Sequence, residues 1–338
     1  MKSASSARVV ALTESRLLGA AVAREAGLPL LPIEERTFED GEFKLRPLES
    51  VRGRTLFVLQ SLAGTGPMPV CERLVRLLWL LHVLRDGGAA STVALLPYLA
   101  FARKERRTQL RDPVATRYLA EQLEASGLGG ALGLDVHNPA AFDNAFRIPT
   151  VHLTALPMMA RHLAARLANA PAVVVSPDVG GIKRAQLFRE RLAAQFGRDV
   201  ELAFLTKRRA KDIVTGGSLA GDVAGRIAVV VDDLCATGGT LIRAALACQQ
   251  AGAKSVQVAV THAPMRSGLE AVLATEAVSG VLVTDSVGLE LPAGPTVTAS
   301  GKLVILPVAT LFGEALRRLV AGVPLASLLV RWPPSLEE

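Results

Sequence analysis

Aromatic residues are scarce in this chain, and cysteines are scarcer still. Phe, Trp and Tyr together make up 4% of the 338 residues while hydrophobic residues make up 50%, so the core is expected to be aliphatic. Three scattered cysteines show no metal-binding spacing, and their odd number argues against a disulfide framework. We therefore expect a reducing, cytoplasmic location and an aliphatic parallel sheet covered by helices.

Long apolar stretches are also missing. The most apolar one, residues 77–84, is too short to cross a bilayer and is flanked by Arg73, Arg76 and Arg85. We expect it to form a buried helix, and we expect no membrane association. Residues 1–21 contain no continuous apolar segment that ends at a cleavage site, so no secretion signal is expected.

The formal net charge of +7 raises the question of a nucleic-acid partner. The basic residues cluster at residues 103–111 and 207–211, without interleaved aromatics, and no helix-turn-helix segment is visible. Anionic small molecules would explain the same charge. We therefore expect no nucleic-acid partner.

Apolar runs alternate with amphipathic segments along almost the whole chain. Strands are predicted at residues 55–60, 92–96, 131–135, 172–176, 201–205, 227–231, 255–260 and 281–284, with helices at residues 70–85, 114–125 and 156–168. This order predicts an α/β protein with parallel sheets. Because Pro149 interrupts the pattern, we expect two domains, residues 1–149 and 150–338, each a mainly parallel sheet flanked by helices.

The most informative stretch is residues 229–240, VVVDDLCATGGT. Its β-branched residues predict a buried strand, and the spacing of residues 241–251 predicts a helix after the glycine turn. Backbone N–H groups at a helix start bind anions, and glycines let a phosphate approach. Asp232 and Asp233 cannot bind phosphate, but they suit ribose hydroxyls or Mg²⁺. The stretch therefore predicts a site for a phosphorylated sugar.

This stretch resembles the phosphoribosyl-diphosphate loop of type I phosphoribosyltransferases, and other polar segments narrow the family. Together they resemble ribose-phosphate diphosphokinases, also called phosphoribosyl-diphosphate synthetases, from about residue 8 to residue 325. The matching segments, in family order, are residues 38–42 (FEDGE), 98–107 (YLAFARKERR), 135–137 (DVH), 176–185 (SPDVGGIKRA), 207–209 (KRR), 261–262 (TH) and 283–286 (VTDS).

The resemblance implies a fold, a reaction and partners. The fold would be two tandem type I phosphoribosyltransferase-like domains. The reaction would transfer the diphosphoryl group of ATP to the C1 hydroxyl of ribose 5-phosphate, giving 5-phosphoribosyl 1-diphosphate and AMP for nucleotide biosynthesis. It also implies a Mg²⁺ cofactor and a homo-oligomer with its active site near a subunit interface.

The resemblance also implies a role for each matching residue. Lys207 and Arg209 match the catalytic pair that stabilises the transferring group, and His137 and Asp178 match the ligands of Mg²⁺. Asp232 and Asp233 would hold ribose hydroxyls and a second Mg²⁺. The residues expected to bind ATP are Phe38, Asp40, Glu42, Arg103 and Lys104, and those expected to bind ribose 5-phosphate are Asp232, Asp233, Ala236, Thr237, Gly238, Gly239 and Thr240.

Four departures from the family pattern point to a divergent branch. Lys104 stands in place of Gln, Glu105 in place of Asp, and Ala236 where many members carry a third acid. Residues 62–76 depart from the usual polar pattern. Because residues near that segment belong to the allosteric phosphate/ADP site of the commonest class, we do not carry that regulation over.

Three alternatives stay open. A simple phosphoribosyltransferase would share the loop at Asp232 but would not need residues 176–185, His137 or a second half. A non-catalytic regulatory paralogue would have lost metal or Lys/Arg residues that this chain has. A phosphoribosyl-binding transcription factor would need an added DNA-binding domain, and none is visible.

Overall fold

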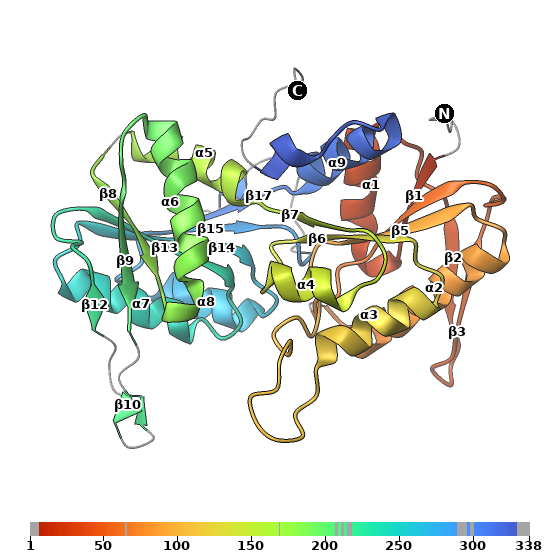
Figure 1. The fold of residues 1–338 in the computed structure, drawn as a ribbon, viewed down its shortest axis with the longest axis horizontal. Coiled ribbons are helices and arrows are strands. Elements are labelled where there is room, and N and C mark those ends of the chain that lie inside the picture. The colour runs from red at the N-terminus through yellow and green to blue at the C-terminus, as the bar shows by residue number, and fades with distance from the viewer. Residues whose placement is uncertain are drawn as a thin grey trace. The chain divides into compact units, whose positions relative to one another are not determined.

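The computed structural model describes residues 7–64, 66–168, 170–206, 218–288 and 301–329. It also gives the backbone of three short strands, Arg209–Ala210 (β10), Ile213–Val214 (β11) and Thr296–Val297 (β16). Contacts divide the chain into two units (Figure 1). The described residues of the first lie within 7–153, 286–288 and 308–325, and those of the second lie within 154–285, 296–307 and 326–329.

The first unit is built on a parallel sheet with strand order β1-β4-β5-β6-β7. Its strands are Ala7–Ala11 (β1), Thr55–Leu59 (β4), Ser91–Leu96 (β5), Gly130–Leu134 (β6) and Thr150–Leu153 (β7). A separate antiparallel hairpin pairs Ile33–Thr37 (β2) with Phe43–Pro47 (β3). The helices are Thr13–Ser15 (η2), Arg16–Ala26 (α1), Val70–Asp86 (α2), Ala115–Ala125 (α3), Pro139–Ala145 (α4) and Ala309–Ala321 (α9).

In the second unit the described strands form a sheet of order β12-β9-β8-β13-β14-β15-β17-β16, parallel except at its two edges. Besides β10, β11 and β16, the described strands are Ala172–Ser176 (β8), Glu201–Leu205 (β9), Leu219–Ala220 (β12), Ile227–Leu234 (β13), Ser255–His262 (β14), Gly280–Thr284 (β15) and Leu303–Leu306 (β17). The helices are Leu156–Leu167 (α5), Val179–Gly181 (η3), Ile182–Phe196 (α6), Gly239–Gln250 (α7), Arg266–Ala274 (α8) and Ala326–Leu329 (η4).

The predicted fold class is confirmed, and every predicted strand is present. One difference bears on the site. β13 continues through both carboxylates to Leu234, because its backbone stays in register with β14 as far as His262. Asp232 and Asp233 therefore lie on the strand, and not after it as the sequence predicted. Asp232 and Leu234 pair with Val260 and His262 of β14, and the backbone N–H of Asp233 between them donates to Oδ1 of Asp232 at 2.9 Å.

The apolar segment 77–84 is a buried helix, as predicted. Leu77, Leu80, Leu81 and Leu84 of α2 are fully buried in the aliphatic core of the first unit. The flanking Arg73 and Arg76 are buried as well, which the sequence did not indicate. None of the helices in the described ranges has both the length and the apolar character that a membrane span requires.

The last long helix, α9, returns to the first unit and lies beside α1 (Figure 1). A Cβ atom on Gly313 would lie 2.4 Å from Cβ of Glu25 and 3.0 Å from the backbone nitrogen of Ala26. The glycine is what lets the two helices approach. The sequence placed the boundary at Pro149 and α9 in the second domain, yet residues 150–153 pair with β6 and complete the first sheet.

Gly313→Ala should lower the free energy of unfolding of the protein. Helix propensity alone would raise it by about 1 kcal/mol. The clash with the α1 backbone should outweigh that gain, since overpacking costs about 1–3 kcal/mol. Chemical unfolding followed by circular dichroism gives the sign of the change, and a stabilised variant would contradict the close contact.

Candidate active site

The end of β13 brings two carboxylates onto one arginine. Arg184, from α6, places Nη1 2.8 Å from Oδ1 of Asp232 and 3.1 Å from Oδ1 of Asp233. The side chains are largely removed from solvent, with 17%, 18% and 6% of their surface exposed, respectively. Two buried carboxylates side by side need a positive charge close to them, and Arg184 supplies it. We therefore include Arg184 in the site.

The two carboxylates also perturb the ionisation of their surroundings. Burial and the neighbouring Asp233 charge raise the pKa of Asp232 to about 7, although Arg184 acts in the opposite direction. Burial, with the nearby Asp232, raises the pKa of the Cys235 thiol to about 11. Cys235 is therefore an inert core thiol, whereas Asp232 would favour a ligand that shares its charge.

Asp178 lies close to this group. Its Oδ1 accepts a hydrogen bond of 3.1 Å from the backbone N–H of Gly181, which caps the turn before α6. Asp178 Oδ1 and Arg184 Nη1 each lie 3.8 Å from the position that a Cβ on Gly181 would take. The segment 176–185 thus delivers a carboxylate and a guanidinium to the same end of the sheet as Asp232.

The turn after β13 forms the start of α7 in the way that the sequence predicted. Gly238 has a φ of 78°, in the left-handed region that favours glycine, and it directly precedes the helix. A Cβ on Gly268, in α8, would lie 1.7 Å from the carbonyl oxygen of Ala236, so the turn packs directly on the α8 backbone. This packing against α8 holds residues 236–240 in place. Their N–H groups lie at the start of a helix, the kind of position that binds anions.

Arg243 adds a cation that the sequence analysis missed. Its Nη2 donates to Oγ1 of Thr240 at 3.2 Å, and its Nη1 lies 3.4 Å from where a Cβ of Gly239 would be. The spacing of three residues from Thr240 on a helix was the available signal, since such residues share a face. An exposed guanidinium beside the turn strengthens its attraction for anions.

In the first unit, residues 38–42 form the turn of the β2–β3 hairpin. The N–H of Phe38 donates to the Glu42 carbonyl at 2.7 Å, and the N–H of Glu42 donates to Oδ1 of Asp40 at 3.0 Å. Phe38 is 39% exposed, with the guanidinium of Arg36 4.9 Å from its ring centre. The turn therefore presents an aromatic face and the carboxylates of Glu39, Asp40 and Glu42 to solvent, a set that suits a heterocyclic base with amino groups.

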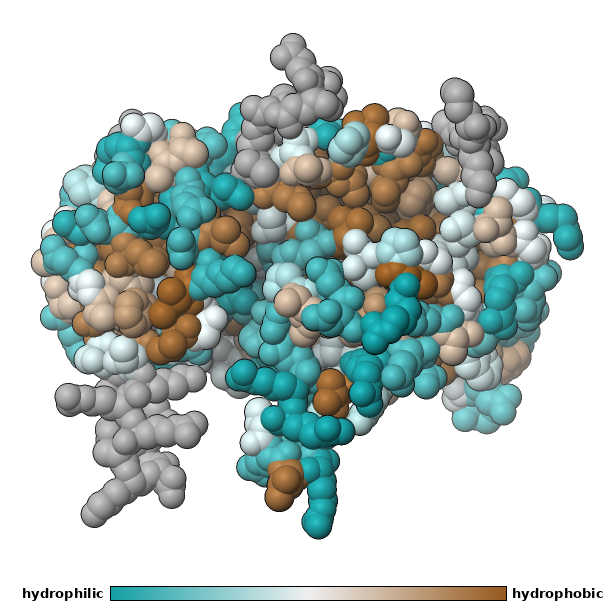
Figure 2. Space-filling view, in the orientation of Figure 1, coloured by the Kyte–Doolittle hydropathy of each residue, from teal (hydrophilic) through white to brown (hydrophobic). Residues whose placement is uncertain are grey.

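Arg103 and Lys104 lie in the long connection between β5 and α3. Both are exposed, and Lys104 Nζ is 4.0 Å from Oδ2 of Asp112. The Thr108 hydroxyl and the N–H groups of Thr108 and Gln109 donate to Asp112, which lowers the pKa of that carboxyl. The connection projects from its unit as a mainly hydrophilic segment (Figures 1 and 2).

His137 follows β6 and is exposed in the first unit, whereas Asp178 belongs to the second. Asp135, just before it, takes a positive φ of 36°, which turns the chain sharply out of the strand. Within the described residues, no three or more His, Cys, Asp and Glu side chains group to hold a metal ion. Lys207 lies outside the described residues, and of Arg209 only the backbone, in β10, is described.

The geometry can be compared with known proteins. Residues 7–127 match the N-terminal domain of ribose phosphate pyrophosphokinase, and residues 153–275 match the phosphoribosyl transferase domain. A ribose-phosphate pyrophosphokinase of Caldanaerobacter subterraneus is 34% identical, covering 92% of this chain and 94% of its own. The Granulibacter bethesdensis enzyme of that name is also 34% identical, covering 92% and 96%. The chain belongs to the ribose-phosphate pyrophosphokinase family.

A solved structure supports the same placement. The phosphoribosylpyrophosphate synthetase from Mycobacterium smegmatis aligns with a TM-score of 0.81 and 28% identity, covering 94% of this chain and 99% of that one. The predicted family and its two phosphoribosyltransferase-like domains are therefore confirmed.

Asp232→Asn should remove a pH dependence of stability. The folded pKa of Asp232, about 7, lies above the ordinary value of 3.8, so the native state holds a proton that the unfolded state has lost. Stability should therefore fall as pH rises through this window in divalent-free buffer. Urea unfolding between about pH 5 and pH 7 measures the slope.

Asp222→Asn is the matched control, because Asp222 is exposed and its carboxylate contacts Arg226 and the N–H of Ala224 on its own loop. That variant should keep the slope of the unmodified protein. Equal slopes in the unmodified protein and in Asp232→Asn would show that Asp232 ionises as freely as a surface carboxyl.

Proposed function

We propose that the chain is a Mg²⁺-dependent enzyme that makes 5-phosphoribosyl 1-diphosphate and AMP from ATP and ribose 5-phosphate. The observation that supports this most directly is the Asp232–Asp233 pair, held by Arg184 immediately before the glycine turn of α7. The pair offers acceptors for vicinal hydroxyls, and the turn offers N–H donors for a phosphate. A sugar that carries both groups would match the two parts at once.

In the proposed reaction, the C1 hydroxyl oxygen of ribose 5-phosphate bonds to the β-phosphorus of ATP. The bond between that phosphorus and the α,β-bridging oxygen breaks, and AMP leaves. The protein would contribute positioning and charge, because phosphoryl transfer needs little covalent help. On the sugar side, Asp232 and Asp233 would orient the ring, while residues 236–240 and Arg243 would anchor the 5-phosphate.

The donor set of the site fits Mg²⁺. This ion is usually held by one or two carboxylates together with phosphate oxygens and water, and it does not require a cage of protein ligands. Asp232 and Asp233 supply hard oxygens in the second unit, and His137 and Asp178 are proposed as ligands of the ion on ATP. When bound, Mg²⁺ would neutralise charge on the phosphate oxygens.

The remaining residues are proposed to act on ATP. Phe38, Asp40 and Glu42 would bind adenine, since the turn presents an aromatic face and two acceptors. Arg103 and Lys104 would contact the phosphates. Lys207 and Arg209 would stabilise the group in transfer, on the strength of the motif alone. A homo-oligomer with its active site near a subunit interface is proposed on the same ground.

The test is AMP release from ATP and Mg²⁺, with and without ribose 5-phosphate, with AMP and ADP separated by chromatography. We expect AMP that depends on the sugar, and no ADP. Lys207→Ala, purified identically, is the control against a contaminating kinase. It should lose about 100-fold or more in kcat with smaller changes in KM, as for a contact made in the transition state.

Other results would reassign the chain. ADP instead of AMP would mean transfer of a single phosphoryl group. Sugar binding without turnover would favour the non-catalytic regulatory paralogue. Release of diphosphate from phosphoribosyl diphosphate in the presence of a free nucleobase would favour a simple phosphoribosyltransferase.

A further inference from the structure

Arg76 is a charged residue that is buried beside the apolar core of the first unit. It lies on α2, the helix that carries the buried Leu77 and Leu80, and it faces the β2–β3 hairpin. Its side chain is only 3% exposed. A guanidinium stays charged at such a site, so its contacts must compensate for the lost hydration.

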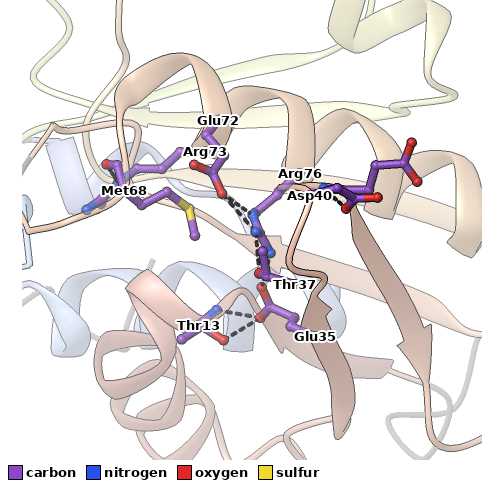
Figure 3. A network of polar contacts seen from close by, with 9 residues as sticks. Thr13, Glu35, Thr37, Asp40, Met68, Glu72, Arg73 and Arg76 are labelled. Atoms are coloured by element: carbon purple, nitrogen blue, oxygen red, sulfur yellow. Dashed lines mark hydrogen bonds and ion pairs between the residues drawn. The ribbon is translucent and has the colours of Figure 1, made fainter.

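Those contacts hold the hairpin at both ends of its turn, and the one with Thr37 is drawn in Figure 3. Nη2 of Arg76 donates to Oγ1 of Thr37 at 2.8 Å, and Thr37 is the residue immediately before Phe38. The guanidinium carbon lies 4.4 Å from the ring centre of Phe43, the residue immediately after Glu42. One side chain thus contacts both strands where the turn of residues 38–42 leaves the sheet.

Two carboxylates fix the guanidinium itself. Nε and Nη2 donate to Oε1 of Glu72, one helical turn earlier, at 3.0 and 2.8 Å. Nη1 lies 3.9 Å from Oε2 of Glu35 on β2. The other oxygen of Glu35 accepts from the N–H and the hydroxyl of Thr13, at 2.6 and 2.8 Å, so β2 is also bonded to the first residue of η2 (Figure 3).

The turn has local hydrogen bonds that define its shape, but these bonds do not define where it sits. Three bonds lie within the turn: the N–H groups of Phe38, Gly41 and Glu42 donate to the Glu42 carbonyl, the Phe38 carbonyl and Oδ1 of Asp40, respectively, so all three join residues of the turn to each other. The position of the turn on the first unit depends on the two residues that flank it, Thr37 and Phe43, which Arg76 contacts. A displacement of about 1 Å at a binding group is enough to weaken a site severely.

We propose that Arg76 is a positioning residue that sets the location of the Phe38–Glu42 turn for the adenine of ATP. This inference rests on the proposed function of that turn. Arg76 itself does not touch the nucleotide; it acts through Thr37 and Phe43. The ribose 5-phosphate side, in the second unit, is not part of this contact network.

Arg73 provides a matched control on the same helix. It is equally buried, with 1% of its side chain exposed, and lies one turn earlier. Its partners include the carboxylate of Glu14 at 2.9 Å and the carbonyl oxygens of Met68 and Ser61. These three lie outside the hairpin, so Arg73→Met removes a buried charge from α2 and leaves the contacts of Arg76 with Thr37 and Phe43 in place.

The experiment compares Arg76→Met, Arg76→Lys, Thr37→Val and Arg73→Met in steady-state kinetics and in hydrogen exchange. Arg76→Met should raise the KM for ATP about tenfold or more, with the KM for ribose 5-phosphate changed less than about twofold. The KM for ATP of Arg76→Lys should lie between those of the unmodified protein and Arg76→Met. Lysine keeps the charge but lacks the planar guanidinium that donates several hydrogen bonds and stacks on Phe43. Arg73→Met should leave both KM values within about twofold. Thr37→Val, on an exposed edge strand, removes only the acceptor and covers the case in which Arg76→Met fails to fold.

Hydrogen exchange separates this proposal from the proposed function. The Phe38 amide should exchange faster in Arg76→Met and Thr37→Val than in Arg73→Met, whether or not the protein turns over ATP. Faster exchange with an unchanged KM for ATP would overturn the adenine role of the turn. Unchanged exchange and unchanged KM in a folded Arg76→Met would overturn the positioning role of Arg76. Equal rises of both KM values in all four variants would show only a general loss of structure and would also overturn it.

Discussion

The second unit depends on one electrostatic contact, between Arg184 and the carboxylates of Asp232 and Asp233. The chain continues β13 past its buried valines, so both acids lie on the sheet, in a setting where ionisation is costly. Arg184 offsets that cost without removing it, because the pKa of Asp232 stays raised. The site is therefore prepared for ligands that can share the charge, such as hydroxyl donors or a divalent cation.

Much of this could be predicted from the sequence because it follows from local rules. Parallel strands leave their carboxyl ends at one edge of a sheet, so polar residues after successive apolar runs must gather there. The run from Val229 to Val231 predicted the strand, and Gly238 and Gly239 predicted the helix start. The hairpin turn at Phe38 needed the resemblance, since FEDGE alone identifies only a turn.

The rest depends on contacts between residues distant in the chain. No pattern at Gly313 shows that it will face Glu25, so the return of α9 to the first unit was not predictable. Arg76 appears in the sequence as a charge that flanks an apolar helix; its burial becomes clear only when Glu35 and Phe43 are placed beside it. Gly268 likewise gives no local sign that it lies under the Ala236 carbonyl.

The most direct test of the central contact is a double-mutant cycle on Arg184 and Asp232, measured by chemical unfolding in divalent-free buffer above about pH 8, beyond the raised pKa of Asp232 of about 7. Arg184→Met alone should cost about 3–5 kcal/mol, because it removes a counter-charge from a buried carboxylate pair. In an Asp232→Asn background the same substitution should cost about 1–3 kcal/mol less. Equal losses of unfolding free energy in the two backgrounds would contradict the claim that Arg184 stabilises the carboxylate pair.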